Sequence, residues 1–246
     1  MGDVMAKLAL ITGASGAIGQ ATALKLAEEG YDLALHYHAN QQKILSLSQE
    51  IKSRWGKEVE IYQADLSQPS GIKELIRALA RRPDILIWTA GMAQSSIFTE
   101  IDEDEYNRMI HLHLTAPFLL TQHVLPAMIR KGWGRIVYVT SIWGETGGAC
   151  ETLYSMTKGG LNALAKALAK EVAPSNITVN AVSPGAIDTP MLQRYSQEEK
   201  EALAAQIPAA RLGEAREVAH AIHFLIQEET AYITGEVLRV NGGWLT

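Results

Sequence analysis

Cysteine is almost absent from this sequence of 246 residues, because Cys150 is the only one. A single thiol cannot form an intramolecular disulfide and cannot supply a multi-cysteine metal site. A small scaffold held together by disulfides is therefore excluded, and no metal site is predicted. This cysteine usage suits a reducing compartment, so we expect the protein to be cytoplasmic.

Long apolar runs and an excess of basic charge are also missing. No apolar run approaches the ~18 residues that span a bilayer, and residues 1–7 lack the features of a signal peptide. The 22 lysine and arginine residues are outnumbered by 27 aspartate and glutamate residues, which gives a net charge of −5. We therefore expect neither a nucleic acid nor a membrane as a partner.

Apolar strand-like runs instead alternate regularly with helical patterns along the whole chain. This alternation predicts an α/β fold, with a doubly wound parallel sheet of seven strands and helices on both faces. The length fits one domain over residues 1–246. The predicted strands cover 7–11, 32–36, 58–62, 84–88, 135–140, 177–182 and 237–240, and the predicted helices cover 21–29, 41–55, 69–82, 102–129, 152–172 and 214–227.

A glycine-rich turn follows the first predicted strand and precedes the first predicted helix. Gly13, Gly16 and Gly19 allow the backbone to turn tightly and to approach a pyrophosphate closely. The N–H groups and the positive end of the helix would then meet the phosphate charge. An ordinary turn is the alternative, but the flanking strand and helix favour phosphate binding.

A serine, a tyrosine and a lysine stand close together in the middle of the chain. Ser141 follows a predicted strand, and Tyr154 and Lys158 lie four positions apart on a predicted helix, so their side chains share one face. A lysine ammonium beside the phenol would lower the pKa of the tyrosine from its ordinary value of ~10. The pattern predicts acid/base chemistry, and an amphipathic helix face with an outward-reaching lysine is the alternative.

These motifs occur in the order typical of short-chain dehydrogenases/reductases of the classical type, and the resemblance covers essentially the whole chain. Further matches are the segments 179–185 and 235–243. The resemblance implies a Rossmann fold and carbonyl reduction, with Ser141 stabilising the substrate oxygen, Tyr154 donating the proton and Lys158 orienting the cofactor. It also implies a homotetramer built on the two long apolar helices. The implied cofactor contacts are Gly13, Ser15, Gly16, Ala17, Ile18, Gly19, Asp65, Leu66, Ala90, Gly91, Tyr154, Lys158, Pro184, Gly185, Ile187 and Thr189.

Three positions depart from the family pattern. Ala17 replaces the middle glycine of the turn, which gives a spacing similar to that of the extended branch, although the chain is too short for that branch's substrate domain. The run 88–91 replaces the usual Asn-Asn-Ala-Gly. His113 aligns with the asparagine that holds a water in the proton relay. His113 is either a buried histidine bonded to a carbonyl or a relay group, and the relay predicts an activity that follows a group titrating near pH ~6.5.

The end of the second predicted strand indicates the choice of cofactor. An acidic residue there would bind the ribose hydroxyls and repel a 2′-phosphate. Residues 36–40 contain no carboxylate, and Asp32 lies at the start of the strand. The sequence therefore favours NADPH, with Ser15, Tyr37 and His38 as candidate phosphate contacts.

Two groups within the family suggest different ketones as the substrate. The chain resembles 3-oxoacyl-acyl-carrier-protein reductases in its length and in segments 134–137 and 232–236, and this type is the first expectation. An acidic carrier protein would need a basic surface, for which Arg130, Lys131 and Arg135 are candidates.

The run 141–151, read with residues 35–37, is more similar to the reductases of the 5-aminopentanone group on elongation factor P. That substrate carries an ammonium, so Trp143, Glu145 and Glu151 are candidate substrate contacts, although a solvated loop would explain the two glutamates equally well. A third hypothesis is a sensor or scaffold that binds NADPH without turnover. The complete set of serine, tyrosine and lysine argues against it.

Overall fold

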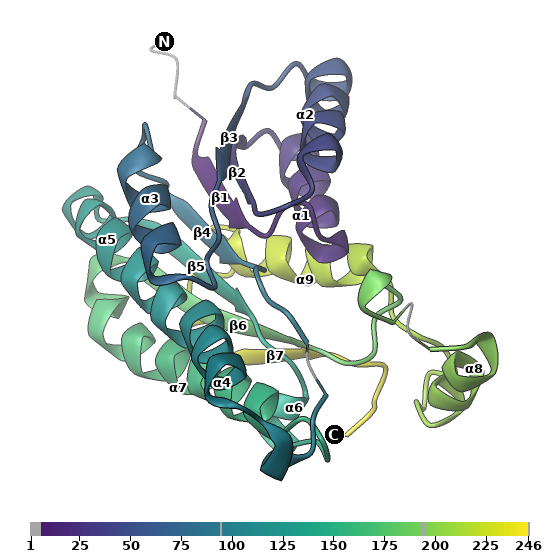
Figure 1. Cartoon of the computed structure of the whole chain (residues 1–246). Helices are drawn as coiled ribbons and strands as arrows, with labels where there is room; N and C mark the ends of the chain where they lie inside the picture. The colour runs from purple at the N-terminus through teal and green to yellow at the C-terminus, as the bar shows by residue number, and fades with distance from the viewer. Residues whose placement is uncertain (1–5, 94, 193–194, 246) are drawn as a thin grey trace.

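In the computed structural model, which describes residues 6–93, 95–192 and 195–245, seven parallel strands form one sheet (Figure 1). The sheet order is β3-β2-β1-β4-β5-β6-β7, so the chain reverses its direction of winding between β1 and β4. This arrangement confirms the predicted doubly wound fold. The strands are β1 (Leu8–Thr12), β2 (Asp32–Tyr37), β3 (Val59–Gln63), β4 (Ile85–Trp88), β5 (Gly134–Val139), β6 (Ile177–Pro184) and β7 (Val237–Val240).

Helices cover both faces of the sheet, as Figure 1 shows. Side chains of each strand alternate between the two layers, so that Leu8 and Leu10 pack on one face while Ala9 and Ile11 pack on the other. Every residue of β1, β4, β5 and β6 is buried, as expected for strands covered on both sides. One layer contains α3 (Pro69–Ala78), α4 (Glu103–Ile110), α5 (Ala116–Lys131) and α7 (Thr152–Val172), and the other contains α1 (Ala17–Glu28), α2 (Gln41–Trp55) and α9 (Ala215–Ile226).

Several predicted boundaries were wrong. Helix α1 begins at Ala17 rather than at residue 21, because Gly16 is already its N-cap. Strand β6 continues through Pro184, which pairs with Val240, although a turn was predicted from residue 183. Helix α3 ends at Ala78 instead of residue 82. Two helices were not predicted, α6 (Trp143–Thr146) and α8 (Gln197–Ala205).

The long helical region predicted over 102–129 contains a π-helical segment, His111–Thr115, between α4 and α5. Pro117 accounts for it, since in a regular α-helix a proline ring strikes the carbonyl of the residue four positions earlier. That residue is His113, and widening of the helix relieves the clash. The side chain of His113, within this segment, is fully buried.

Two features are not found among the described residues, a membrane-spanning helix and a metal site. No helix there combines the length and apolarity that crossing a bilayer requires. No group of three or more histidine, cysteine or acidic side chains in those ranges is arranged to hold a metal ion.

Candidate active site

The glycine-rich turn is packed so closely against the rest of the sheet that side chains would not fit. Gly13 has φ +66°, and a Cβ atom built on it would lie 2.7 Å from the Ala90 Cα atom. A Cβ atom on Gly19 would lie 2.5 Å from the Gly13 carbonyl oxygen. The first turn of α1 contains no acidic side chain. The turn therefore leaves room for a phosphate next to a helix N-terminus.

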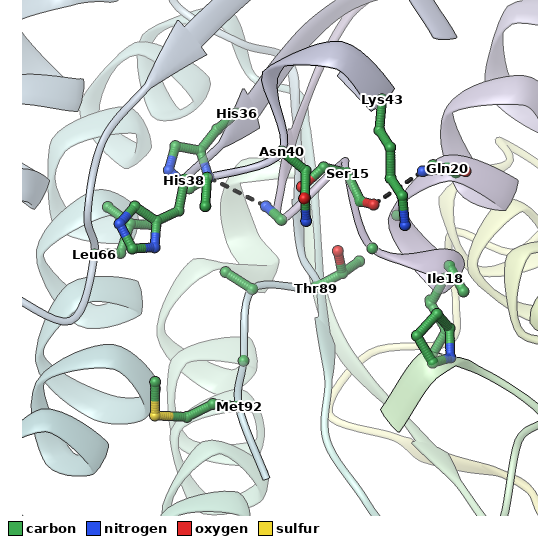
Figure 2. A pocket seen from close by; sticks show the side chains of 18 of the residues that line it. Ser15, Ile18, Gln20, His36, His38, Asn40, Lys43, Leu66, Thr89 and Met92 are labelled. Carbon is green, nitrogen blue, oxygen red and sulfur yellow. Dashed lines mark hydrogen bonds between the residues drawn. The ribbon is translucent and has the colours of Figure 1, made fainter. Parts of the chain in front are cut away.

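His36 holds this turn in place, a role that the sequence did not reveal. Its Nδ1 atom accepts a hydrogen bond from the Gly13 N–H at 3.1 Å, and its Nε2 atom lies 3.1 Å from the Ala64 carbonyl oxygen, to which it donates. Burial lowers the pKa of His36 to about 4. The neutral ring thus connects the turn to the end of β3 at physiological pH, and Figure 2 shows the ring beside the turn.

A groove of about 470 Å³ runs along the turn and the ends of β2 and β4. Tyr37, a predicted phosphate contact, does not reach it, because the side chain is 4% exposed and packs in the core. Asn40 and Lys43 are among the lining residues that were not predicted, and Figure 2 shows them beside Ser15. The predicted residues that the structure brings to the groove are Gly13, Ser15, Gly16, Ala17, Ile18, Gly19, His38, Asp65, Leu66, Ala90, Gly91 and Thr189.

The altered run 88–91 makes its own hydrogen bonds to the neighbouring strand. The Thr89 hydroxyl donates to the Thr12 carbonyl oxygen at 2.5 Å, and the Ala90 N–H donates to the Thr12 hydroxyl at 3.3 Å. Asp65 accepts hydrogen bonds from the backbone and the hydroxyl of Ser67. These contacts fix the loops that form the floor of the groove.

A second cavity, of about 240 Å³, lies at the carboxyl ends of β5 and β6 and brings the predicted serine, tyrosine and lysine together. Ser141 is hydrogen-bonded to the Tyr154 phenol. The Lys158 Nζ atom donates to the Val139 carbonyl oxygen at 3.0 Å and lies 5.4 Å from the centroid of the Tyr154 ring. Further predicted cofactor contacts that line this cavity are Pro184, Gly185, Ile187 and Thr189.

Burial dominates the protonation of Tyr154 and Lys158. It raises the pKa of Tyr154 to about 12, although the hydrogen bond with Ser141 acts in the opposite direction. Burial also lowers the pKa of Lys158 to about 7. The expected lowering of the tyrosine pKa by the lysine is therefore not found, because both groups have lost their hydration. Tyr154 carries its proton at neutral pH and can act as a donor.

His113 lies directly behind this pair. Its ring meets the Tyr154 ring edge-on, with 5.7 Å between the centroids. A Cβ atom on Gly91 would lie 2.9 Å from the His113 Cε1 atom and 3.6 Å from the Lys158 Nζ atom. Gly91 therefore packs closely against both His113 and Lys158. The Nε2 atom lies 3.0 Å from the Met92 carbonyl oxygen and 3.2 Å from the Met92 nitrogen.

The protonation of His113 differs from the prediction. Burial, together with the charge of Lys158, lowers its pKa well below the ordinary value of 6.5. The expected dependence of activity on a group near pH ~6.5 therefore has no support at this residue. The Nδ1 atom is buried and makes no hydrogen bond with the described residues.

The structure separates the two candidate glutamates. Glu145 does not line the cavity, because its carboxylate accepts hydrogen bonds from Ser183 at 2.7 Å and from Arg239 at 2.7 and 2.9 Å. Trp143 and Glu151 do line it. The sequence offered no signal for four further lining residues, which lie outside recognisable motifs: Leu192, Tyr195, Leu203 and Trp244.

The two cavities form one continuous site that fits a dinucleotide. They share Ile18, Thr89, Gly91, Met92 and Thr189. The cradle at Gly13 suits a pyrophosphate, and the polar end at Lys158 suits a ribose. These residues can hold a nicotinamide cofactor with its reactive end near Tyr154.

Comparison with known proteins agrees with this arrangement. The family model described as enoyl-(acyl carrier protein) reductase matches residues 13–245. The uncharacterized oxidoreductase YmfI of Bacillus subtilis is 46% identical over 98% of this chain and 99% of its own length. The 3-oxoacyl-[acyl-carrier-protein] reductase FabG of Staphylococcus epidermidis is 37% identical over 97% of this chain and 99% of its own length.

Solved structures give the same fold. The crystal structure of YwfH, an NADPH-dependent reductase involved in bacilysin biosynthesis, superposes with a TM-score of 0.91 at 26% identity, covering 98% of this chain and 99% of YwfH. A blue fluorescent protein from a metagenomic library, in complex with NADPH, gives a TM-score of 0.90 at 31% identity and covers 98% of both chains. Sequence, fold and site together show that the chain belongs to the short-chain dehydrogenase/reductase family of oxidoreductases.

Proposed function

We propose that this protein uses NADPH to reduce a ketone whose chain carries a positive charge, such as the 5-aminopentanone group on a lysine of elongation factor P. The observation that carries the proposal is the position of Glu151, which lines the cavity that contains Ser141 and Tyr154. The charge of Glu151 contributes to the raised pKa of Tyr154, so it acts at the reacting end of the cavity.

The cavity around Glu151 suits a cation in a second respect. Trp143, Tyr195 and Trp244 line the same space, and aromatic faces attract ammonium groups. A carboxylate in a partly dehydrated cavity favours a cationic substrate and disfavours an anionic one. The closer resemblance of run 141–151 to the elongation factor P reductases supports the same substrate class.

In this proposal each polar group near the ketone has a task. NADPH, when bound, supplies the hydride. Ser141 and Tyr154 hydrogen-bond the ketone oxygen, and Tyr154 gives that oxygen its proton as negative charge develops. Lys158 is held by the Val139 carbonyl and orients the cofactor ribose. His113, neutral and packed against Tyr154, is a positioning residue for this pair.

Lys43 and the lack of a carboxylate at the end of β2 support NADPH over NADH. Ser15, Asn40 and Lys43 line the groove on one side of the turn, where they offer hydrogen bonds and one positive charge to a 2′-phosphate. The NADPH-dependent YwfH and the NADPH complex of the metagenomic protein support the same choice.

A 3-oxoacyl-acyl-carrier-protein reductase is the second candidate, favoured by the 37% identity to FabG. The basic residues considered for carrier docking do not support it. The Arg135 side chain is 0% exposed, and Lys131 pairs with Asp84 at 2.5 Å. Arg135 also stands at the start of β5, whereas Ser141 follows the end of that strand, so these residues lie at the wrong edge of the sheet.

We also propose a homotetramer built on the helices of one layer. Tyr106, Phe118, Ile129 and Met156 are 45–50% exposed on α4, α5 and α7, which is unusual for large apolar side chains on neighbouring helices. Burial between copies would remove them from water. Light scattering of the purified protein, with Phe118→Glu as the variant, tests this assembly.

One assay tests the substrate. NADPH consumption is measured with ketone-modified elongation factor P and with an acetoacetyl thioester, using the wild type, Glu151→Gln and the control Glu171→Gln on the exposed surface of α7. We expect turnover of the modified factor, a loss of about tenfold in kcat/KM for Glu151→Gln and no loss for the control.

The other outcomes of this assay are also informative. Turnover of the thioester alone would replace the proposal by the second candidate. Tight NADPH binding without turnover of either ketone, or of a broader panel, would favour a sensor or scaffold.

A further inference from the structure

The chain reverses sharply after β7 and returns to the active site. The Trp244 N–H donates to the Asn241 carbonyl oxygen at 3.1 Å, and the two residues between them have positive φ, +63° for Gly242 and +83° for Gly243. This is a type I′ turn, which requires residues such as glycine at both central positions. The turn directs Trp244 to the cavity that contains Tyr154.

This turn is fixed by close packing on both sides. A Cβ atom on Gly242 would lie 2.8 Å from the Ile207 Cγ2 atom, and the Ala209 N–H donates to the Gly242 carbonyl oxygen at 3.0 Å. On the other side, a Cβ atom on Gly185 would lie 3.0 Å from the Asn241 Cα atom. The position of Trp244 is therefore set by the end of β6 and by the segment after α8.

Trp244 meets a second tryptophan from a distant part of the chain. The rings of Trp143 and Trp244 are T-shaped, with 5.5 Å between the centroids and 71° between the planes. A Cβ atom on Gly148 would lie 3.0 Å from the Trp143 Cδ2 atom and 3.2 Å from the Glu151 Cβ atom. The two tryptophans and Glu151 thus line the same cavity.

An ion pair ties together the two segments that carry these rings. Glu145 lies two positions after Trp143 on α6, and Arg239 precedes the turn on β7. The Arg239 Nη2 atom lies 2.7 Å from the Glu145 Oε2 atom, and the buried Ser183 donates to the other carboxylate oxygen. The pair holds α6 against β7 without entering the cavity itself.

We propose that Trp244 is a specificity-determining residue, which forms with Trp143 an aromatic wall against the substrate's chain beyond the carbonyl, and that Glu145 and Arg239 are positioning residues for this wall. An aliphatic chain packs on the ring faces, and a cationic end gains from their negative potential. The preference for the cationic end rests on the proposed function. The contact with the aliphatic chain does not.

Two methyl ketones of the same shape test this wall. One chain ends in a trimethylammonium group and the other in an uncharged tert-butyl group. We expect Trp244→Ala to lower kcat/KM about tenfold for the charged ketone and about threefold for the uncharged one, through KM. Trp244→Phe should keep most of the wild-type kcat/KM. Leu245→Ala, at the neighbouring exposed position, should leave kcat/KM unchanged. Quenching of tryptophan fluorescence by each ketone measures binding without turnover.

The ion pair is tested by exchanging its charges. Glu145→Arg should raise KM for both ketones, and adding Arg239→Glu should restore it, whereas the Kd for NADPH should stay unchanged throughout. A KM that does not respond to Trp244→Ala for either ketone would overturn the inference. Equal kcat/KM for the two ketones in the wild type would instead overturn the cationic substrate and leave the aromatic wall in place.

Discussion

The cofactor groove and the substrate cavity are built in opposite ways. The groove depends on backbone and on the lack of side chains, since a Cβ atom at Gly13 or Gly19 would strike neighbouring main chain. The cavity depends on side chains from distant segments, such as Trp143 and Trp244. Added atoms should therefore damage the groove, whereas removed atoms should damage the cavity.

The largest effect is expected from removing one oxygen atom in the cavity. Tyr154→Phe deletes the proposed proton donor and keeps the ring that packs against His113. We expect kcat to fall about a thousandfold, while the Kd for NADPH changes by less than about twofold. Single-turnover kinetics and equilibrium titration measure the two quantities. The control is Tyr232→Phe at a fully exposed position, and a small loss in kcat would show that another group donates the proton.

Adding one methyl group to the turn should weaken cofactor binding in the groove. Gly13→Ala places a Cβ atom 2.7 Å from the Ala90 Cα atom, in addition to the strain at φ +66°. We expect the Kd for NADPH to rise by about thirtyfold, because the turn must move. Gly30→Ala is the matched control, since Gly30 also has positive φ but no atom within 4 Å of the added group. Equal affinities in the two variants would show that the close approach at Gly13 does not control cofactor binding.

A smaller effect should separate the two cofactors. Lys43→Gln removes the positive charge that lines the groove near Ser15. We expect the Kd for NADPH to rise about tenfold and the Kd for NADH to stay the same, because only NADPH carries the 2′-phosphate. Lys52→Gln on the same helix, where Lys52 pairs with Glu58, serves as the control. An equal loss for both cofactors would place Lys43 elsewhere along the dinucleotide.

The smallest effect concerns pH. Because the folded-state pKa of His113 lies well below 6.5, the unfolded chain binds a proton that the folded chain does not as the pH falls through 6.5. The free energy of unfolding then decreases as the pH falls below 6.5, by at most about 1.4 kcal/mol per pH unit from this group. His113→Asn should make the free energy of unfolding less dependent on pH between about pH 7 and pH 5. Urea unfolding at several pH values measures it, and an unchanged slope would contradict a neutral His113.

The sequence predicted the groove better than the cavity, for a physical reason. Strands covered on both faces must be apolar throughout, and a turn around a phosphate must contain glycine, so both leave a local pattern. Ser141, Tyr154 and Lys158 also follow local rules, because a strand end and one helical turn bring them together.

The remaining contacts depend on tertiary packing that no short pattern records. The burial of Tyr37, the pairing of Glu145 with Arg239 and the return of Trp244 each involve segments distant in sequence. The π-helical segment at His113 was not predicted either, although the clash that the Pro117 ring makes in a regular α-helix could have indicated a distortion there.

The low pKa of Lys158 has a consequence for chemical reactivity. An amine with a pKa of about 7 is, near neutral pH, about half in its uncharged form, and that form is a nucleophile. Lys158 is almost fully buried, so only small amine-reactive probes that enter the cavity should reach it, and a filled groove should shield it. The lysine proposed to orient the cofactor is thus also a titratable amine whose modification would report whether the cofactor is bound.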